Sequence, residues 1–125
     1  MDIVVTKAEL AGALGRVQGI VERKNTVPIL SCVLLEASGA ELAISATDLE
    51  IFLRSRHAAK VAKEGVVTAP AKKFFEIVRE LPEGDVRIVA GDKGWVRIET
   101  GRARFKVTSL PKEDFPPLPA DADGD

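Results

Sequence analysis

The sequence has few of the residues on which metal, disulfide and nucleophilic chemistry usually depends. Its 125 residues include one cysteine and one histidine. The single cysteine, Cys32, excludes an internal disulfide, and its place in the apolar run SCVLLE favours a small core residue over a reactive thiol. With His57 as the only histidine, the chain cannot supply a cluster of histidine and cysteine metal ligands. We therefore expect no cofactor, and a structural or surface role for His57.

Signals for membranes and targeting are also missing. No apolar run approaches the length of a membrane span, and the opening letters MDIVVTKAEL contain no basic region followed by an apolar one. A lone cysteine suits a reducing compartment. These features predict a soluble, cytoplasmic protein with no membrane partner.

Catalytic and nucleotide-binding motifs are sparse. The chain contains neither a GxxxxGK(S/T) phosphate loop nor a GxGxxG fingerprint. Asp48 and Glu50 are a close carboxylate pair of the kind used in acid–base catalysis, but an aspartate in a turn is the ordinary explanation. Trp95 has no aromatic neighbour, so we expect a strand residue with one packed face rather than a platform for stacking bases. The sequence indicates no enzyme, and a small hydrolase using Asp48 and Glu50 stays as an alternative.

Charge is balanced overall but unevenly distributed. The chain has 18 basic and 19 acidic residues, a net charge of −1. Residues 111–125 hold five carboxylates and one lysine, which leaves 17 basic and 14 acidic residues, or +3, in the remainder. An excess of this size matters through its placement rather than its magnitude.

An internal repeat organises the chain. The letters VVT at residues 4–6 recur at residues 66–68, and 62 residues is half of the length. Each copy leads into a helical pattern and then into three short extended runs separated by turn signals. We predict one α+β domain of two β-α-β-β-β halves, with eight strands and two helices.

Apolar spacing places the two helices. Thr6 followed by Glu9 is typical of a reciprocal capping box at the start of the first helix, and Pro70 suits the first position of the second. Each helix is predicted to bury one stripe, while the opposite face of the first is small and basic. The stripes are Leu10, Leu14, Val17 and Val21, then Phe74, Ile77, Val78 and Leu81; the small, basic face holds Gly12, Arg16, Gly19 and Arg23.

Strands are predicted at residues 29–36, 41–45, 49–57, 86–89, 95–99 and 102–109, besides the one before each helix. Residues 58–65 are polar and are expected to loop between the halves. In residues 102–109, Arg102, Arg104 and Lys106 alternate with Ala103, Phe105 and Val107, so cations line one face of a terminal strand. The residues after Leu110 lack periodicity and are expected to form a linker.

Four segments carry a resemblance to a known family. VPILSCVLLE, ATDLEI, TAPAKKFFEIVRELPEG and GRARFKVTSLPKEDFPPLP resemble the first domain of the bacterial DNA polymerase III beta subunit, the sliding clamp. The resemblance runs from residue 1 to about 118. It implies a DNA-clamp fold in which two helices pack on two antiparallel four-stranded sheets. It also implies that residues 1–118 are the N-terminal domain and that residues 119–125 are an acidic linker to later domains that this sequence lacks.

The resemblance implies a function without catalysis. In this family two subunits of three such domains form a ring, which acts in DNA replication as a processivity factor by holding the replicative polymerase on duplex DNA. The implied partners are duplex DNA, a second clamp subunit, and the polymerase and clamp loader, the last two through the later domains. A protein–protein interaction module that pairs through its edge strand, with no DNA role, stays as an alternative.

Two sets of site residues follow. Sliding requires weak, sequence-blind contact with phosphates, for which the candidates are Arg16, Arg23, Lys24 and Lys72. Lys24 matches a family position that carries a DNA-contacting basic residue, often arginine; solvated surface cations are the alternative for this set. By resemblance, the subunit interface would use Lys73, Arg102, Arg104 and Phe105, with Phe105 as apolar anchor. The alternative for Phe105 is burial in the domain's own core.

Overall fold

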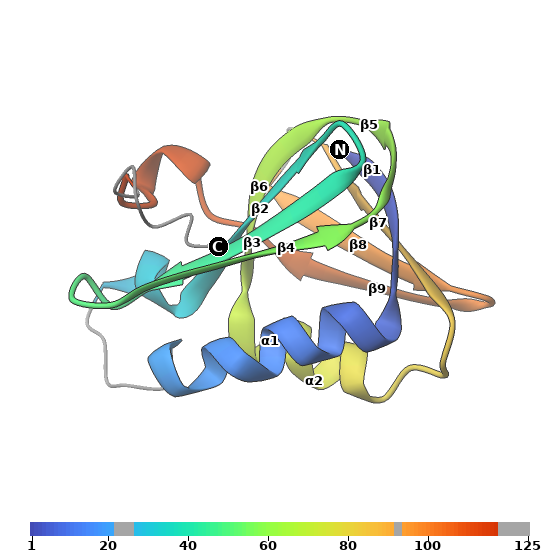
Figure 1. Ribbon diagram of the computed structural model, residues 1–125, viewed down its shortest axis with the longest axis horizontal. Helices are drawn as coiled ribbons and strands as arrows, with labels where there is room; N and C mark the ends of the chain where they lie inside the picture. The colour runs from blue at the N-terminus through green and yellow to red at the C-terminus, as the bar shows by residue number, and fades with distance from the viewer. Residues whose placement is uncertain (22–26, 92–93, 118–125) are drawn as a thin grey trace.

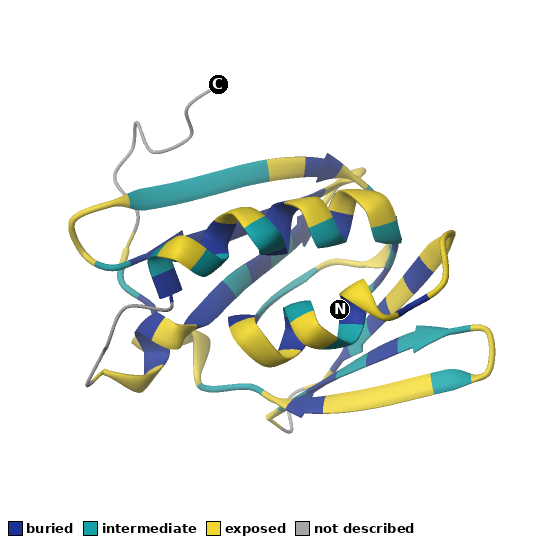
Figure 2. Ribbon diagram, turned by 90° about the horizontal axis from the view of Figure 1, so that it is seen from below, coloured by how far each residue is buried: buried dark blue, intermediate teal, exposed yellow. Residues whose placement is uncertain are grey.

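The computed structural model describes residues 1–21, 27–91 and 94–117. Helices α1 (Lys7–Val21) and α2 (Ala71–Arg79) lie side by side along one side of the molecule, as two perpendicular views agree (Figures 1 and 2). Two antiparallel sheets cover their other side. Neither helix is long and apolar enough to cross a membrane within the part of the chain that the structure describes.

The strands form a five-stranded and a four-stranded sheet. Sheet A has the order β5-β1-β7-β8-β9, and sheet B has the order β4-β3-β2-β6. Sheet A contains β1 (Asp2–Thr6), β5 (Lys60–Lys63), β7 (Asp85–Ala90), β8 (Trp95–Thr100) and β9 (Ala103–Thr108). Sheet B contains β2 (Cys32–Ser38), β3 (Glu41–Thr47), β4 (Phe52–Ala58) and β6 (Gly65–Pro70).

The topology confirms the duplicated plan. The orders β1-α1-β2-β3-β4 and β6-α2-β7-β8-β9 are the same, and the first strand of each half completes the sheet of the other, because β1 pairs with β7 and β6 with β2. The VVT repeat aligns the two halves with an offset of 62 residues, which is wrong by two. The helices begin 64 residues apart, at Lys7 and Ala71. A shift of two residues keeps the inward face of a strand, so Val5 and Ala69 are both buried before their helices.

The prediction of eight strands in two four-stranded sheets is wrong by one strand. Residues 60–63, expected within a polar loop, form β5 and pair with β1. Val61 packs against the core, while Lys60 and Lys63 are exposed. Lysines on a short edge strand discourage pairing with other chains, and the same lysines give the segment the composition of a loop.

Two further segments depart from the sequence prediction. Residues 28–31 form the 3-10 helix η1 (Pro28–Ser31) before β2 begins, whereas an uninterrupted strand was expected. The expected linker after Leu110 contains a second 3-10 helix, η2 (Lys112–Asp114), followed by Phe115, which is buried against Ile29, Leu30 and Cys32. The burial of Phe115 and two hydrogen bonds between Thr68 and Leu110 hold this segment against the domain. Residues 118–125 lie outside the described part of the chain.

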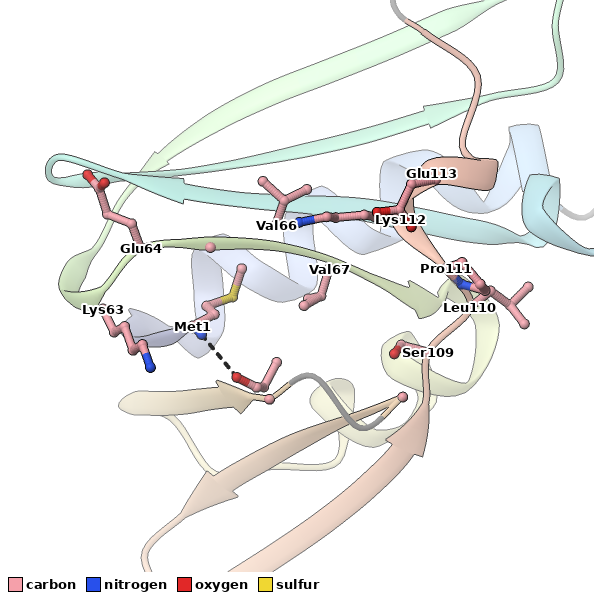
Figure 3. A pocket seen from close by; sticks show the side chains of 14 residues that line it. Met1, Lys63, Glu64, Val66, Val67, Ser109, Leu110, Pro111, Lys112 and Glu113 are labelled. Carbon is pink, nitrogen blue, oxygen red and sulfur yellow. Dashed lines mark hydrogen bonds between the residues drawn. The ribbon is translucent and has the colours of Figure 1, made fainter.

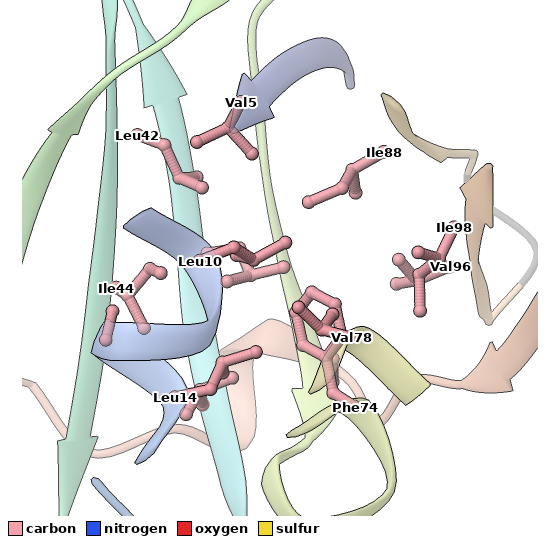
Figure 4. Close-up of a cluster of buried hydrophobic side chains, with 14 of the residues drawn as sticks. Val5, Leu10, Leu14, Leu42, Ile44, Phe74, Val78, Ile88, Val96 and Ile98 are labelled. Carbon is pink, nitrogen blue, oxygen red and sulfur yellow. The ribbon is translucent and has the colours of Figure 1, made fainter. Parts of the chain in front are cut away.

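One core fills the space between the helices and both sheets (Figure 4). Leu10 and Leu14 from α1 meet Phe74 and Val78 from α2, and all four side chains are fully buried. Burying a side chain of this size contributes about 1.5–3 kcal/mol. The predicted stripes are confirmed except at Ile77, which is only half-buried. The shared core thus holds α1 and α2 together.

Candidate nucleic-acid and subunit interfaces

The two helices pack directly against each other, with Gly15 of α1 facing the Phe75 ring of α2. A Cβ atom at Gly15 of α1 would lie 3.5 Å from the Phe75 ring of α2. The Gln18 side-chain amide donates hydrogen bonds to the Leu14 carbonyl at 3.0 Å and to the Ala71 carbonyl at 3.2 Å, which ties α1 to the first residue of α2. The packing fixes how the exposed faces of the two helices lie relative to each other.

The exposed face of α1 has small residues and, among the described residues, one cation. Ala8, Gly12, Arg16 and Gly19 are exposed along it (Figure 2). A Cβ atom at Gly12 would lie 3.5 Å from an Arg16 guanidinium nitrogen, so the arginine lies back along the helix over the glycine. The predicted small, basic face is confirmed at these positions.

The predicted DNA-contacting residues are only partly described. Arg16 on α1 and Lys72 on α2 are exposed on neighbouring helices, whereas Arg23 and Lys24 lie outside the described residues. The described exposed charges of the two helices and of the C-cap of α2 are Arg16, Lys72, Lys73 and Arg79, against Glu9, Glu76 and Glu80. This part of the surface is therefore only mildly cationic, which suits weak contact with phosphates.

Strand β9 is an open edge of sheet A, as the sequence predicts for a terminal strand. Its register places Arg104 opposite Glu99 and Phe105 opposite the buried Ile98. Phe105 therefore points toward the helix side of the sheet, yet it remains 40% exposed. The alternative that Phe105 is buried in the domain's own core is not what the structure has; an exposed aromatic at a free edge is available to a partner.

The remaining predicted interface residues surround this edge. Arg102 is exposed in the turn before β9, where Gly101 has a positive φ of 51°. Lys73 is exposed on α2, and α2 contacts β9. The Arg104 Nε lies 3.9 Å from a Glu99 carboxylate oxygen, while its side chain is 75% exposed. The four residues thus come from adjoining elements at one end of sheet A.

Asp48, considered above for catalysis, and His57, considered for metal binding, both have structural partners. The Asp48 carboxylate accepts hydrogen bonds from the Glu50 and Ile51 backbone N–H groups at 2.9 and 2.7 Å, which closes the turn after β3. His57 is buried, with one ring nitrogen 2.8 Å from Glu9 and the other 2.8 Å from the Ser55 hydroxyl. These contacts give Asp48 and His57 structural partners, and the burial of His57 agrees with the structural rather than the surface form of the predicted structural or surface role.

The same contacts correct the capping-box prediction. The Thr6 hydroxyl accepts a hydrogen bond from the Glu9 N–H at 3.3 Å, as predicted. The Glu9 carboxylate, however, bonds to His57 of β4 instead of returning to the backbone of Thr6. The side chain of Glu9 therefore joins the first turn of α1 to sheet B.

A cleft of about 630 Å³ lies between β6 and residues 109–113 (Figure 3). Its wall includes the Met1 amine, which donates a hydrogen bond to the Ala90 carbonyl at 3.0 Å, and it carries both signs of charge from Lys63, Glu64, Lys112 and Glu113. No group of three or more potential metal ligands occurs among the described residues. Among the described residues, the cleft therefore contains no such group of ligands.

A network of ion pairs on sheet A was not predicted from the sequence. The Arg87 guanidinium donates two hydrogen bonds to the Asp2 carboxylate, at 2.9 and 2.7 Å, and this contact holds the pKa of Asp2 below its usual value. Arg87 and Arg97 also contact Glu99. Alternation in Asp85-Val86-Arg87 and in Trp95-Val96-Arg97 signals an exposed charged face, but the network depends on cross-strand register, which the sequence does not contain.

Comparison with known proteins gives consistent matches over almost the whole chain. The family described as "DNA polymerase III beta subunit, N-terminal domain" matches residues 1–119. A beta sliding clamp of Caulobacter vibrioides is 45% identical over 123 residues, which is 97% of this chain and 33% of the relative. A beta sliding clamp of Chlamydia muridarum is 37% identical over 119 residues, or 95% and 32%. The chain spans about a third of the length of these relatives.

Solved structures agree with the fold. Caulobacter crescentus pol III beta matches with a TM-score of 0.89 at 45% identity, covering 97% of this chain and 33% of that one. The Helicobacter pylori beta clamp bound to a DNA ligase peptide matches with a TM-score of 0.90 at 30% identity, covering 95% and 33%. The helix pair and the two sheets are thus similar to a clamp domain in both arrangement and sequence.

Proposed function

Because the chain belongs to the family of DNA polymerase III beta subunit N-terminal domains, we propose that it serves as one segment of a ring-shaped sliding clamp. In this role it tethers a replicative DNA polymerase to duplex DNA, without sequence specificity and without catalysis. The observation that carries the proposal is the helix pair, which lies along one side of the molecule (Figure 1) and on which Arg16 and Lys72 are exposed. The proposed place of action is the cytoplasm.

The helix face suits contact that must not stop sliding. Cations attract phosphates without reading base edges, and a surface with glycine at positions 12 and 19 lets a duplex pass close to the backbone. We assign the DNA contact to Arg16, Arg23, Lys24 and Lys72. Lys24 belongs to this set by resemblance to the family.

The sheet edges suit extension into a ring. The last strand of each half, β4 in sheet B and β9 in sheet A, has one edge that pairs with no strand of the described chain. We assign β9 to a second clamp subunit, with Phe105 as apolar anchor and Lys73, Arg102 and Arg104 facing acidic partners. The counterpart edge of β4 is available to another segment. Binding of polymerase and clamp-loader peptides is assigned to other segments of the ring, beyond residues 1–118.

The helix-face assignment is tested by fluorescence anisotropy of a labelled DNA duplex at rising salt. Replacing Arg16 and Lys72 with glutamine should lower the slope of log affinity against log salt by about 1 for each phosphate that is no longer neutralised. Lys24→Glu should weaken binding further. The control, Lys7→Gln with Lys112→Gln, removes two positive charges outside both proposed surfaces and should keep the slope.

The same experiment separates the proposal from its alternative. A pure protein-interaction module would bind no duplex at low salt and would be indifferent to Lys24→Glu. Equal slopes for the helix-face variant, the control and the unaltered chain would overturn the DNA assignment of the helices. Edge pairing is tested separately, because Phe105→Asp should abolish association through β9 and leave duplex binding unchanged.

A further inference from the structure

The outer face of sheet A, the face turned away from the helices, carries a net positive charge among the described residues. Residues directly opposite each other on neighbouring strands share a face, and the register runs from Lys60 through Val4, Arg87 and Glu99 to Arg104. Among the described residues, the outer face holds six cations and three carboxylates. The cations are Lys60, Lys63, Arg87, Arg97, Arg104 and Lys106; the carboxylates are Asp2, Asp85 and Glu99.

Two of the three carboxylates are less exposed to solvent than the cations that contact them. The Glu99 side chain is 14% exposed, and it is contacted by Arg87, Arg97 and Arg104. The Asp2 side chain is 27% exposed, against 49% for Arg87, which binds it. A ligand that approaches this face meets guanidinium and ammonium groups before it meets those carboxylates. The exposed potential is therefore more positive than the simple count of charges implies.

Three lysines on this face have no acidic partner within the described residues. Lys60 and Lys63 are exposed on β5, and Lys106 is exposed on β9, where its ammonium lies 5.1 Å from the centre of the Trp95 ring. Arg97 also contacts this ring, at 5.6 Å. Cations thus cover Trp95, so the face offers positive charge rather than an aromatic surface for stacking.

The side chains exposed on the face favour a polyanion over a folded protein as partner. No large apolar side chain among residues 1–21, 27–91 and 94–117 is exposed on it, and Phe105, the exposed aromatic of β9, points to the other side of the sheet. Trp95 is half-buried there and is covered by Arg97 and Lys106, so a protein partner would find little exposed apolar surface to bury. By contrast, the outer face of sheet B carries the Glu36–Arg54 ion pair at 3.3 Å and borders a cavity lined by Phe115.

Charge density favours nucleic acid over an acidic peptide. Five strands about 4.8 Å apart span about 19 Å between the outermost strands. Duplex DNA carries about eleven phosphate charges over that length, counted on all its sides, whereas an extended peptide has about six side chains in all. We propose that the outer face of sheet A binds the phosphate backbone of duplex nucleic acid without sequence preference, as a second contact surface separate from the helix face.

The test uses the anisotropy assay with a variant that leaves both helices unchanged. Lys60→Gln with Lys106→Gln removes one cation from each end of sheet A and leaves no described carboxylate without its partner. Both lysines are exposed, so the far-UV circular dichroism spectrum and the thermal midpoint should stay unchanged. The salt slope for a labelled duplex should fall by about 1.8, since each neutralised phosphate contributes about 0.9. Lys7→Gln with Lys112→Gln is the charge-matched control.

The possible results separate this proposal from the helix-face assignment. A lower slope for the sheet A variant, unmatched by the control, supports the second surface whatever the Arg16 and Lys72 variant does. A sheet A variant that behaves like its control overturns the proposal, even when the helix-face variant loses binding. Poly-glutamate that competes with the duplex at equal charge concentration would also overturn it, in favour of an acidic peptide as ligand.

Discussion

The two halves of the chain share a frame and differ at their surfaces. In each half a strand enters a helix and three antiparallel strands follow, and both helices bury their apolar stripes in one core. The first half has a helix of 15 residues and contributes three strands to sheet B, whose outer face lies beside the segment that carries Phe115. The second half has a helix of nine residues and contributes three strands to the cationic sheet A. The two halves are thus alike in their inward positions and differ in their outward ones.

The largest effect on stability is expected from substitutions in the core that both halves share. Phe74→Ala should lower the free energy of unfolding by about 3–5 kcal/mol and Leu14→Ala by about 2–5 kcal/mol, because both side chains are fully buried. Trp95 is the only tryptophan and belongs to the second half. Urea transitions followed by circular dichroism and by tryptophan fluorescence should coincide in both variants. If Leu14→Ala moved the first signal and left the second in place, the halves would unfold independently.

The contact between β6 and the segment after β9 provides the next test. The buried Thr68 hydroxyl of β6 donates to the Leu110 carbonyl at 2.8 Å and accepts from the Leu110 N–H at 2.9 Å. Thr68→Val should cost about 1–3 kcal/mol, since it leaves two partly buried backbone groups of Leu110 without their hydrogen-bond partner. It should also speed proteolysis within residues 111–117. Thr108→Val, at an exposed position of β9, is the control, and equal cleavage rates in the two variants would contradict the role of Thr68.

The packing of α1 against α2 can be tested at Gly15. Gly15→Leu should destabilise the chain by about 1–3 kcal/mol, because the added atoms would have to displace the Phe75 ring. Gly15→Ala should be neutral or stabilise the chain by up to about 1 kcal/mol, since its Cβ atom makes an ordinary contact at 3.5 Å and alanine favours the helix. Thermal midpoints of the two variants measure the difference. A destabilising alanine would mean that the helices lie closer than the structure has them.

The smallest expected effect concerns pH and the sheet A network. Arg87 holds the pKa of Asp2 below its ordinary value of 3.8 chiefly by hydrogen bonding. A carboxylate with a lowered pKa in the folded state stabilises the fold above its unfolded pKa, and this contribution disappears as the pH falls through the folded value. The difference in unfolding free energy between the unaltered chain and Asp2→Asn should be at most about 1 kcal/mol at neutral pH and should shrink below about pH 4. A difference that grew in acid would contradict the ion pair.

The frame was predictable because its signals are local. The spacing of Leu10, Leu14 and Val17 and the recurrence of a strand before a helix predict the helices, the halves and the α+β class. Strand β5 was missed because its lysines resemble a loop, and the burial of Phe115 depends on a surface that residues 29–32 build far away in the sequence. Local patterns do not contain such long-range contacts.

The candidate surfaces were predictable in part. Alternation in residues 102–109 predicts a strand with Arg104 and Phe105 on opposite faces, and the register agrees. That β9 is an edge was also predicted, from its place at the end of the repeat. The cationic face of sheet A was not predicted, because Lys60 and Arg104 are far apart in sequence and share a face only through the order of the strands.

The most direct test of a shared frame with divergent surfaces is a titration of the isotope-labelled chain with duplex DNA at low salt, followed by amide chemical shifts. The account predicts salt-sensitive shifts around Arg16 and Lys72 on the helices and around Lys60 and Lys106 on sheet A, while amides near Glu36 and Arg54 of sheet B stay unchanged. Shifts centred on sheet B, or spread equally over both sheets, would contradict it.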